Sequence, residues 1–302
     1  MKAIKWILFS LAVLYACCVT YAVIPQKSIP VQELAGANSH FIQVKDRQFH
    51  YEKYGSGKPI VLVHGFAGST YTWRNVIPLL AQNYTVYAFD LPGFGLSDKS
   101  PEANYDMRSQ AAAVIDFINA LNLPSVYLIG HSMGGVITGF ATILAPRKIE
   151  KAVIIDAGFY HGGSPKFFQK LFFPFDVIMA RSFYTKSTRL RSLASSYFNK
   201  AIITDDLVEH YLQPTRTPHA ADALAKMMRT ASGETYEGIS SNITVPTLLI
   251  WASQDNHMPL TDADRLHKEI NNSQLVIIDQ SGHMVQEEQP QKVVEAIRQF
   301  LR

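Results

Sequence analysis

Residues 125–135 read Ser-Val-Tyr-Leu-Ile-Gly-His-Ser-Met-Gly-Gly, and this stretch decides the predicted fold. The apolar run at its start is typical of a buried strand, and the residues from Met133 onward are typical of a helix. Between them stands a G-x-S-x-G motif at residues 130–134, and a strand before it and a helix after it make this short pattern informative. We therefore expect a sharp turn that presents Ser132 as a nucleophile.

The small residues of this motif have a physical reason. Side chains at Gly130 and Gly134 would collide with the turn, and Gly135 lets the helix pack close to the sheet. The backbone N–H of Met133 would then point at the oxygen of a bound carbonyl, where the positive end of the helix favours negative charge. A dinucleotide-binding turn is disfavoured, because Ser132 stands where the middle glycine of G-x-G-x-x-G would be.

Outward from this motif, short apolar runs alternate with amphipathic ones. The predicted strands are 41–45, 48–54, 59–63, 84–89, 125–129, 151–155, 247–251 and 274–278. The predicted helices are 73–80, 106–121, 133–144, 262–270 and 291–301. Such alternation predicts an α/β fold whose mostly parallel sheet is covered by helices on both faces.

The alternation breaks between residues 159 and 242, where we find no convincing strand. This segment is helical in pattern and aromatic near its start, with Phe167, Phe168, Phe172, Phe173, Phe175, Phe183 and Tyr184. We expect a core built from residues 41–158 and 243–302, with residues 159–242 inserted as a helical cap. The phenylalanines would either contact an apolar substrate or pack the cap onto the core.

The N-terminus has the pattern of a membrane segment. Lys2 and Lys5 precede an uncharged stretch at residues 6–25, and about 20 apolar residues can cross a bilayer as a helix. We expect residues 1–25 to be a signal-anchor that places the body outside the cytoplasm. A cleaved secretory signal and a lipoprotein signal ending at Cys17 are the alternatives. Residues 26–40 are polar and contain proline, as in a linker.

Composition narrows the classes of function. The 302 residues are 47% hydrophobic and 18% charged, which is enough for a sizeable core. A net charge of +3 is too small to indicate a nucleic-acid partner. Cys17 and Cys18 are the only cysteines, so we expect no disulfide, no cysteine nucleophile and no cysteine metal site in the body. No metal or organic cofactor is implied.

The partners of Ser132 should come from loops after later strands, because such loops converge at one edge of a parallel sheet. His283 follows the last strand and is the expected base, with His257 as its rival. Asp255 follows the strand 247–251 and is the expected acid that orients the base, with Asp156 as its rival. The order Ser, Asp, His along the chain is that of the α/β-hydrolases.

The remaining catalytic element is an oxyanion hole, which needs a second backbone N–H from a loop after an earlier strand. Phe66, in the sequence His64-Gly65-Phe66-Ala67-Gly68, is placed to supply it alongside Met133. We expect His64 to hold this loop rather than to transfer protons. The similar His161-Gly162-Gly163 comes after the serine, and we interpret it as loop geometry.

Over residues 41–302 the chain resembles the α/β-hydrolase superfamily. The matching pieces are His64-Gly65-Phe66, residues 90–98 (DLPGFGLSD), residues 130–135 (GHSMGG), residues 251–255 (WASQD), Ser281-Gly282-His283, Glu288 and Pro290. The resemblance implies an eight-stranded sheet whose second strand is antiparallel, together with a helical cap. It also implies that residues 90–98 form a structural loop, so no catalytic role falls to Asp90 or Asp98.

The resemblance also indicates which activities are favoured and which are disfavoured. Relatives with an aspartate nucleophile, the epoxide hydrolases and haloalkane dehalogenases, are disfavoured by Ser132. The layout is similar to monoacylglycerol lipases, esterases and carbon–carbon bond hydrolases, although Ala252 stands where relatives usually carry glycine. We expect hydrolysis of a small-molecule ester or lipid with an apolar acyl chain. Carbon–carbon or peracid chemistry on the same residues and a non-catalytic binding protein are the alternatives.

Overall fold

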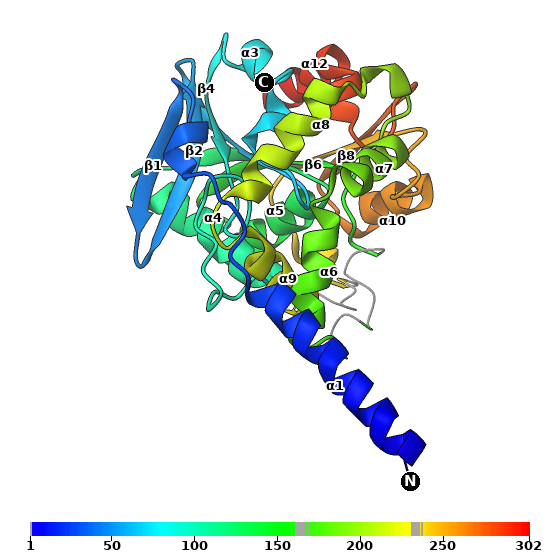
Figure 1. Cartoon of the computed structure of the whole chain (residues 1–302). Coiled ribbons are helices and arrows are strands. Elements are labelled where there is room, and N and C mark those ends of the chain that lie inside the picture. The colour runs from blue at the N-terminus through cyan, green and yellow to red at the C-terminus, as the bar shows by residue number, and fades with distance from the viewer. Residues whose placement is uncertain (1, 161–166, 168–169, 231–235, 237) are drawn as a thin grey trace.

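The computed structural model describes residues 2–160, 167, 170–230, 236 and 238–302. Its eight strands form one sheet in the order β1-β2-β4-β3-β5-β6-β7-β8 (Figure 1). They are β1 (Ser39–Val44), β2 (Arg47–Tyr54), β3 (Lys58–Val63), β4 (Tyr84–Phe89), β5 (Val126–His131), β6 (Ile149–Ile155), β7 (Thr247–Ala252) and β8 (Ser273–Ile278). Only β2 runs antiparallel to its neighbours, which confirms the expected α/β-hydrolase arrangement.

Helices cover both faces of this sheet. One face carries α4 (Met107–Ala120), α5 (Met133–Leu144) and α10 (Leu260–Glu269), and the other carries α3 (Ile77–Leu80) and α12 (Pro290–Leu301). On β3, Val61 and Val63 face the first set, whereas Ile60 and Leu62 face the second. Every residue of this run is buried, because a central parallel strand contacts helices on both sides.

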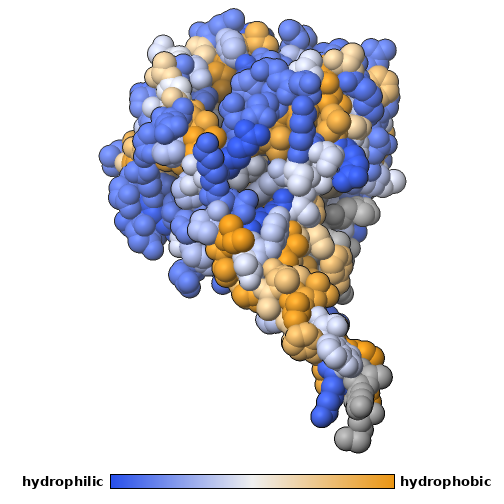
Figure 2. Space-filling view, in the orientation of Figure 1, coloured by the Kyte–Doolittle hydropathy of each residue, from blue (hydrophilic) through white to orange (hydrophobic). Residues whose placement is uncertain are grey.

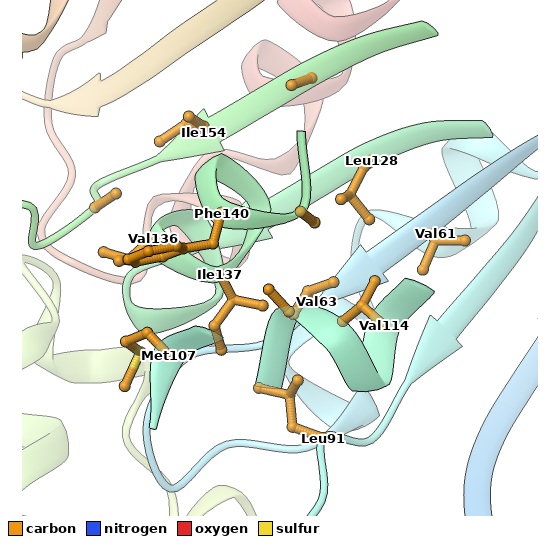
Figure 3. Packing of buried hydrophobic residues seen from close by; sticks show 14 of the residues in the cluster. Val61, Val63, Leu91, Met107, Val114, Leu128, Val136, Ile137, Phe140 and Ile154 are labelled. Atoms are coloured by element: carbon orange, nitrogen blue, oxygen red, sulfur yellow. The ribbon is translucent and has the colours of Figure 1, made fainter. Parts of the chain in front are cut away.

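Figure 3 shows the core on the α4 and α5 face. Val61 of β3 and Leu128 of β5 point toward Val114 of α4, while Ile137 and Phe140 of α5 fill the adjoining space (Figure 3). Complete burial of each such side chain stabilises the fold by about 1.5–3 kcal/mol. This rigid core holds the carboxyl ends of β3, β5, β6 and β7 next to one another.

The predicted helix 73–80 is instead two short elements. A 3₁₀ turn, η1 (Thr70–Trp73), precedes α3, and Ser69 caps the turn by accepting a hydrogen bond from the Tyr71 N–H. Pro78 lies in the first turn of α3. Proline lacks the N–H that an uninterrupted helix requires there, so a new helix starts instead.

Between β6 and β7 the described residues form helices and 3₁₀ turns and contain no strand. The α-helices are α6 (Phe175–Phe183), α7 (Lys186–Ser196), α8 (Asp205–Leu212) and α9 (Ala220–Thr230). The 3₁₀ turns are η3 (Lys200–Ile202), η4 (Gln213–Arg216) and η5 (Ser240–Asn242). We refer to residues 159–242 as the cap segment. His161-Gly162-Gly163 and Phe168 lie outside the described residues.

Helix α1 (Lys2–Val23) projects away from the rest of the protein (Figure 1). Its stretch Ile4–Val23 has a mean hydropathy of 2.0 and is only 6% buried, and Figure 2 shows apolar side chains on its surface. Its contacts with the described part of the body come from its last turns, where Ala22 packs on α6 and Arg181 donates hydrogen bonds to the backbone carbonyls of Tyr21 and Ala22. Length and composition alone therefore allow α1 to cross a membrane.

The segment predicted as a linker, residues 26–40, contains structure of its own. It holds the short helix α2 (Val31–Leu34), and the N–H of Ile29 donates to the carbonyl of Arg216 in the cap segment. Its last residues begin β1, because Ser39 and His40 continue the antiparallel register with β2. Pairing with a neighbouring strand is not visible in the local composition that favoured a linker.

Candidate active site

The turn that carries Ser132, the expected nucleophile, joins β5 to α5 and has the strain that the motif predicts; we refer to it as the nucleophile turn. Ser132 has φ 55° and ψ −120°, a backbone conformation that side-chain-bearing residues rarely adopt. A Cβ at Gly130 would lie 2.1 Å from the carbonyl oxygen of Gly134, and a Cβ at Gly134 would lie 2.3 Å from that of Val63. Neither distance is sterically possible, so glycine is required at both positions.

Ser132, His283 and Asp255 come together although they lie on three separate loops. The Oγ of Ser132 is 2.9 Å from Nε2 of His283, and Nδ1 of His283 is 2.7 Å from Oδ2 of Asp255. Because an ionised carboxylate only accepts, Nδ1 carries the proton and Nε2 accepts from the serine hydroxyl. His283 is therefore placed to act as a general base toward Ser132.

The surroundings of Asp255 favour its ionised form. Its side chain is fully buried, and its Oδ1 accepts hydrogen bonds from the N–H groups of His257 at 2.7 Å and Met258 at 3.0 Å. Burial alone would raise the pKa of Asp255, but the hydrogen bond and charge of His283, together with these two N–H groups, lower it overall. An ionised Asp255 holds His283 in the tautomer that can accept the serine proton.

Asp156, the rival acid, lies nearby but makes different contacts. Its Oδ1 accepts from the N–H of Ala252 at 2.8 Å, while its Oδ2 is buried without a hydrogen-bond partner among the described residues. Burial and then the negative charge of Asp255 raise its pKa well above the usual value. These surroundings favour the protonated form of Asp156, and among the described residues it has no hydrogen bond to His283.

His131 connects the nucleophile turn to the loop that contains His283. Its Nε2 lies 2.6 Å from the backbone carbonyl oxygen of His283. Side-chain atoms of His131, Asp156 and His283 lie within 4.8 Å of one another, a spacing that could hold a metal ion. Both nitrogens of His283 already form hydrogen bonds, so an ion bound here would have to displace one of them.

The loop expected to complete an oxyanion hole touches the nucleophile turn. A Cβ at Gly65 would lie 3.0 Å from the Cβ of Ser132. The backbone N–H groups of Phe66 and Met133 donate to no described residue, which leaves them available to a ligand. The fully buried His64 uses both of its ring nitrogens structurally, donating from Nδ1 to the carbonyl of Gly65 and accepting at Nε2 from the Leu91 N–H.

Two contacts between the cap segment and this site were not predicted from sequence. Glu288 accepts hydrogen bonds from the N–H groups of Gly282 at 2.7 Å and Asn199 at 2.7 Å, which joins the loop of the base to the cap segment. His257 places its Nε2 3.2 Å from the Oγ of Ser196 on α7. Glu288 belongs to the residues that resemble the α/β-hydrolases, but no sequence pattern indicated which groups it contacts.

A cavity of about 340 Å³ lies between the cap segment and the loop that contains Phe66 and Ala67, which we refer to as the expected oxyanion loop. The core contributes Phe66 and Ala67. The cap segment contributes Phe183, Thr188, Arg189, Arg191, Ser192, Ser195 and Leu224. A small organic molecule fits this volume, and its wall is partly apolar.

Comparison with known proteins agrees with this fold. Residues 58–290 match the family described as alpha/beta hydrolase fold. The uncharacterized hydrolase YugF of Bacillus subtilis (strain 168) is 30% identical over 254 residues, which cover 84% of this chain and 93% of YugF. The 2-hydroxy-6-oxononadienedioate/2-hydroxy-6-oxononatrienedioate hydrolase 1 of Dechloromonas aromatica (strain RCB) is 27% identical, covering 88% of this chain and 96% of that protein.

Among solved structures, a serine hydrolase involved in carbazole degradation, the CarC enzyme, superposes with a TM-score of 0.72. It is 26% identical, and the match covers 87% of this chain and 98% of CarC. The family match alone spans most of the chain and includes the G-x-S-x-G turn. This chain therefore belongs to the α/β-hydrolase fold family.

Proposed function

We propose that the protein is a serine hydrolase that cleaves carboxylic esters with an apolar acyl chain. The observation that carries the proposal is the continuous hydrogen-bond chain from Ser132 through His283 to Asp255, with distances of 2.9 and 2.7 Å. A hydroxyl that donates to a histidine oriented by a carboxylate is the arrangement that activates serine for acyl transfer.

The reaction proceeds through an acyl-enzyme. Oγ of Ser132 attacks the ester carbonyl while Nε2 of His283 takes its proton, and the N–H groups of Phe66 and Met133 stabilise the resulting oxyanion. The C–O bond to the alcohol then breaks, and His283 returns the proton to the departing oxygen. Water loses a proton to His283, attacks the acyl carbon and releases the acid with regeneration of the Ser132 hydroxyl.

The position of α1 supports a lipid ester as substrate. The exposed Phe172, Phe173 and Phe175 lie beside this helix, with the Tyr15 hydroxyl 3.4 Å from the carbonyl of Phe173 and the Tyr15 and Phe175 rings 6.3 Å apart. We propose that α1 anchors the protein in a membrane with the body outside the cytoplasm. The exposed phenylalanines would then meet the lipid surface.

Carbon–carbon bond hydrolysis is the second candidate. The relative from Dechloromonas aromatica, named as an oxo-dienedioate hydrolase, and the CarC serine hydrolase are both similar to this chain over most of its length. The same Ser132 and His283 could attack and protonate a ketone substrate. A 2-hydroxy-6-oxo-dienoate tested beside esters separates the two reactions, since the favoured substrate has the larger kcat/KM.

The main test combines active-site labelling with a substrate series. A fluorophosphonate probe should label the wild-type protein and Asp156→Asn but not Ser132→Ala. Turnover of 4-nitrophenyl esters should rise from acetate to octanoate if the acyl site is apolar. Absence of both labelling and turnover in the folded wild-type protein would mean a binding protein, and a maximum at acetate would contradict the apolar acyl chain.

A further inference from the structure

The cavity between the expected oxyanion loop and the cap segment is lined by a buried cationic side chain, that of Arg189. Arg189 lines the cavity from α7, and the residue is only 7% exposed. Phe66, whose backbone N–H we assign to the oxyanion hole, lines the same cavity. The cavity therefore adjoins both Arg189 and the loop that we propose to bind the oxyanion.

Arg189 has no anionic partner among the described residues. It forms none of the ion pairs there, and its Nε is buried without a hydrogen bond. The Tyr211 ring is a close neighbour, with its centroid 5.9 Å from the guanidinium carbon. Burial lowers the pKa of Arg189, because desolvation disfavours the charged form, but an arginine stays charged in proteins.

A desolvated cation without a counter-ion destabilises the site that holds it. A ligand that brings an anion into the cavity removes this cost and gains charge-assisted hydrogen bonds. The described lining of the cavity contains no carboxylate that could take this role. Thr188 and Ser192, which line it beside Arg189, offer hydroxyl groups to the same anion.

Helix α7 carries Arg189 near one end and approaches His257, the neighbour of His283, near the other. Near the far end of the helix, the Oγ of Ser195 is 3.4 Å from Nε2 of His257, whose ring centroid is 5.0 Å from that of His283. Arg189 precedes Ser195 by six residues, which places it roughly 9 Å farther along the helix. An anion bound there would thus lie roughly 9 Å along α7 from the end of the helix that contacts His257.

We propose that Arg189 binds an anionic group of the substrate, a carboxylate or a phosphate, while the ester carbonyl lies at Ser132. The inference rests on the proposed ester hydrolysis and narrows its substrate class. Phe66, Phe183 and Leu224 give the cavity wall apolar surface beside Arg189. The substrate is then an ester with a mostly apolar body and a negative charge away from the scissile bond.

The test measures kcat/KM of the full-length protein on two matched pairs of substrates. The first pair is 4-nitrophenyl octanoate and the mono-4-nitrophenyl ester of suberic acid, which differ by a terminal carboxylate. The second pair is monooleoylglycerol and its phosphate, which differ by a phosphate on the alcohol side. We expect the charged member of one pair to be preferred by about 10- to 100-fold, the range of one charged hydrogen bond. The pair that responds identifies the anion.

The variant Arg189→Gln should abolish this preference while leaving the rate on the neutral member nearly unchanged. Arg191→Gln is the matched control, since Arg191 is an exposed cation on the same helix and cavity wall. The Arg191→Gln protein should keep most of the preference for the charged substrate. If Arg189→Gln does not fold, Arg189→Lys should retain a reduced preference, because lysine keeps the charge but not the two-pronged geometry.

Three results would overturn the inference. They are the absence of a preference in the wild-type protein for either pair, an equal loss on charged and neutral substrates in Arg189→Gln, and an equal loss of preference in Arg191→Gln. Failure of the proposed ester hydrolysis looks different, because neither neutral ester would then be turned over and the fluorophosphonate would not label Ser132.

Discussion

Nε2 of His131 donates a hydrogen bond to the backbone carbonyl of His283, 2.6 Å away. Since a carbonyl can only accept, the proton must reside on Nε2 of His131. His131 is the last residue of β5 and directly precedes Ser132. The bond therefore connects the loop that carries His283, the proposed base, to the strand that precedes Ser132, the proposed nucleophile, and it holds Nε2 of His283 within reach of the serine hydroxyl.

This buried histidine should make the protein sensitive to acid. Burial, followed by the nearby charge of His283, lowers the pKa of His131 from 6.5 to about 3. Between these values the unfolded chain binds a proton that the folded protein does not, so stability falls as the pH falls. The slope is up to about 1.4 kcal/mol per pH unit.

Urea unfolding from pH 6.5 down to pH 4 tests this effect. The variant His131→Gln, which keeps a donor but does not titrate, should lose stability less steeply than wild type. His267→Asn changes an exposed histidine and serves as the control, with a slope like that of wild type. Equal slopes for His131→Gln and wild type would contradict the assignment.

The two buried aspartates should respond oppositely to replacement by asparagine. If the proposed roles hold, Asp255→Asn removes the charge that orients His283 and should lower kcat by about 10⁴-fold, the loss known for Ser-His-Asp enzymes. Asp156→Asn mimics the protonated form that the raised pKa of Asp156 favours, so kcat should change by less than about 3-fold, since the side-chain oxygen still accepts from Ala252. Steady-state rates on one ester decide the question, and similar losses in both variants would refute the assigned roles.

Asp156 should also destabilise the folded protein at neutral pH. Because its folded pKa is raised, the folded state binds a proton that the unfolded state releases above its usual pKa of 3.8. Stability therefore falls as the pH rises from that value toward the folded pKa. Asp156→Asn removes this loss, so its free energy of unfolding at pH 7 should exceed that of wild type.

The turn itself can be tested at Gly134. A Cβ there would meet the carbonyl oxygen of Val63 at 2.3 Å, so Gly134→Ala must shift the turn or β3. We expect a loss of about 1–3 kcal/mol or more in stability, together with most of the activity. Gly36→Ala is the control, because nothing lies within 4 Å of its Cβ. A Gly134→Ala protein with wild-type stability would contradict the close packing.

We expect the side chain of Glu287 to stabilise the packing of the cap segment against the core. Its fully buried carboxylate forms an ion pair with Arg74 and accepts hydrogen bonds from the hydroxyls of Thr72, Tyr197 and Tyr211. It lies in α11 (Val285–Glu288), whereas the tyrosines belong to the cap segment. Glu287→Gln leaves Arg74 without a counter-charge and should cost about 3–5 kcal/mol of unfolding free energy.

Glu209→Gln provides the comparison for this prediction. Glu209 pairs with Arg216 at the protein surface, and such pairs contribute about 0–1 kcal/mol. Chemical denaturation of both variants should therefore separate them clearly. A similarly small change for Glu287→Gln would show that the buried cluster does not hold the cap segment in place.

Local patterns of the chain were enough to predict the core. The buried run at β3 and the G-x-S-x-G turn depend on residues close in sequence, because strand burial and turn geometry follow from neighbouring side chains. The prediction of one helix at residues 73–80 was wrong for a local reason, because Pro78 lies in the first turn of a new helix there. Ser39 and His40, at the end of the predicted linker, belong to β1 because their partners lie in β2, which is distant from the local pattern.

The sequence by itself thus determined the α/β architecture, the strained position of Ser132 and the loops that supply its partners. Only the tertiary structure decided that His283 pairs with Asp255 rather than Asp156, and that Arg189 is buried without a counter-ion among the residues that the structure describes. The physical reason is distance along the chain. Periodicity and turn chemistry act over a few residues, whereas hydrogen bonds, desolvation and charge depend on which distant segments the fold brings together.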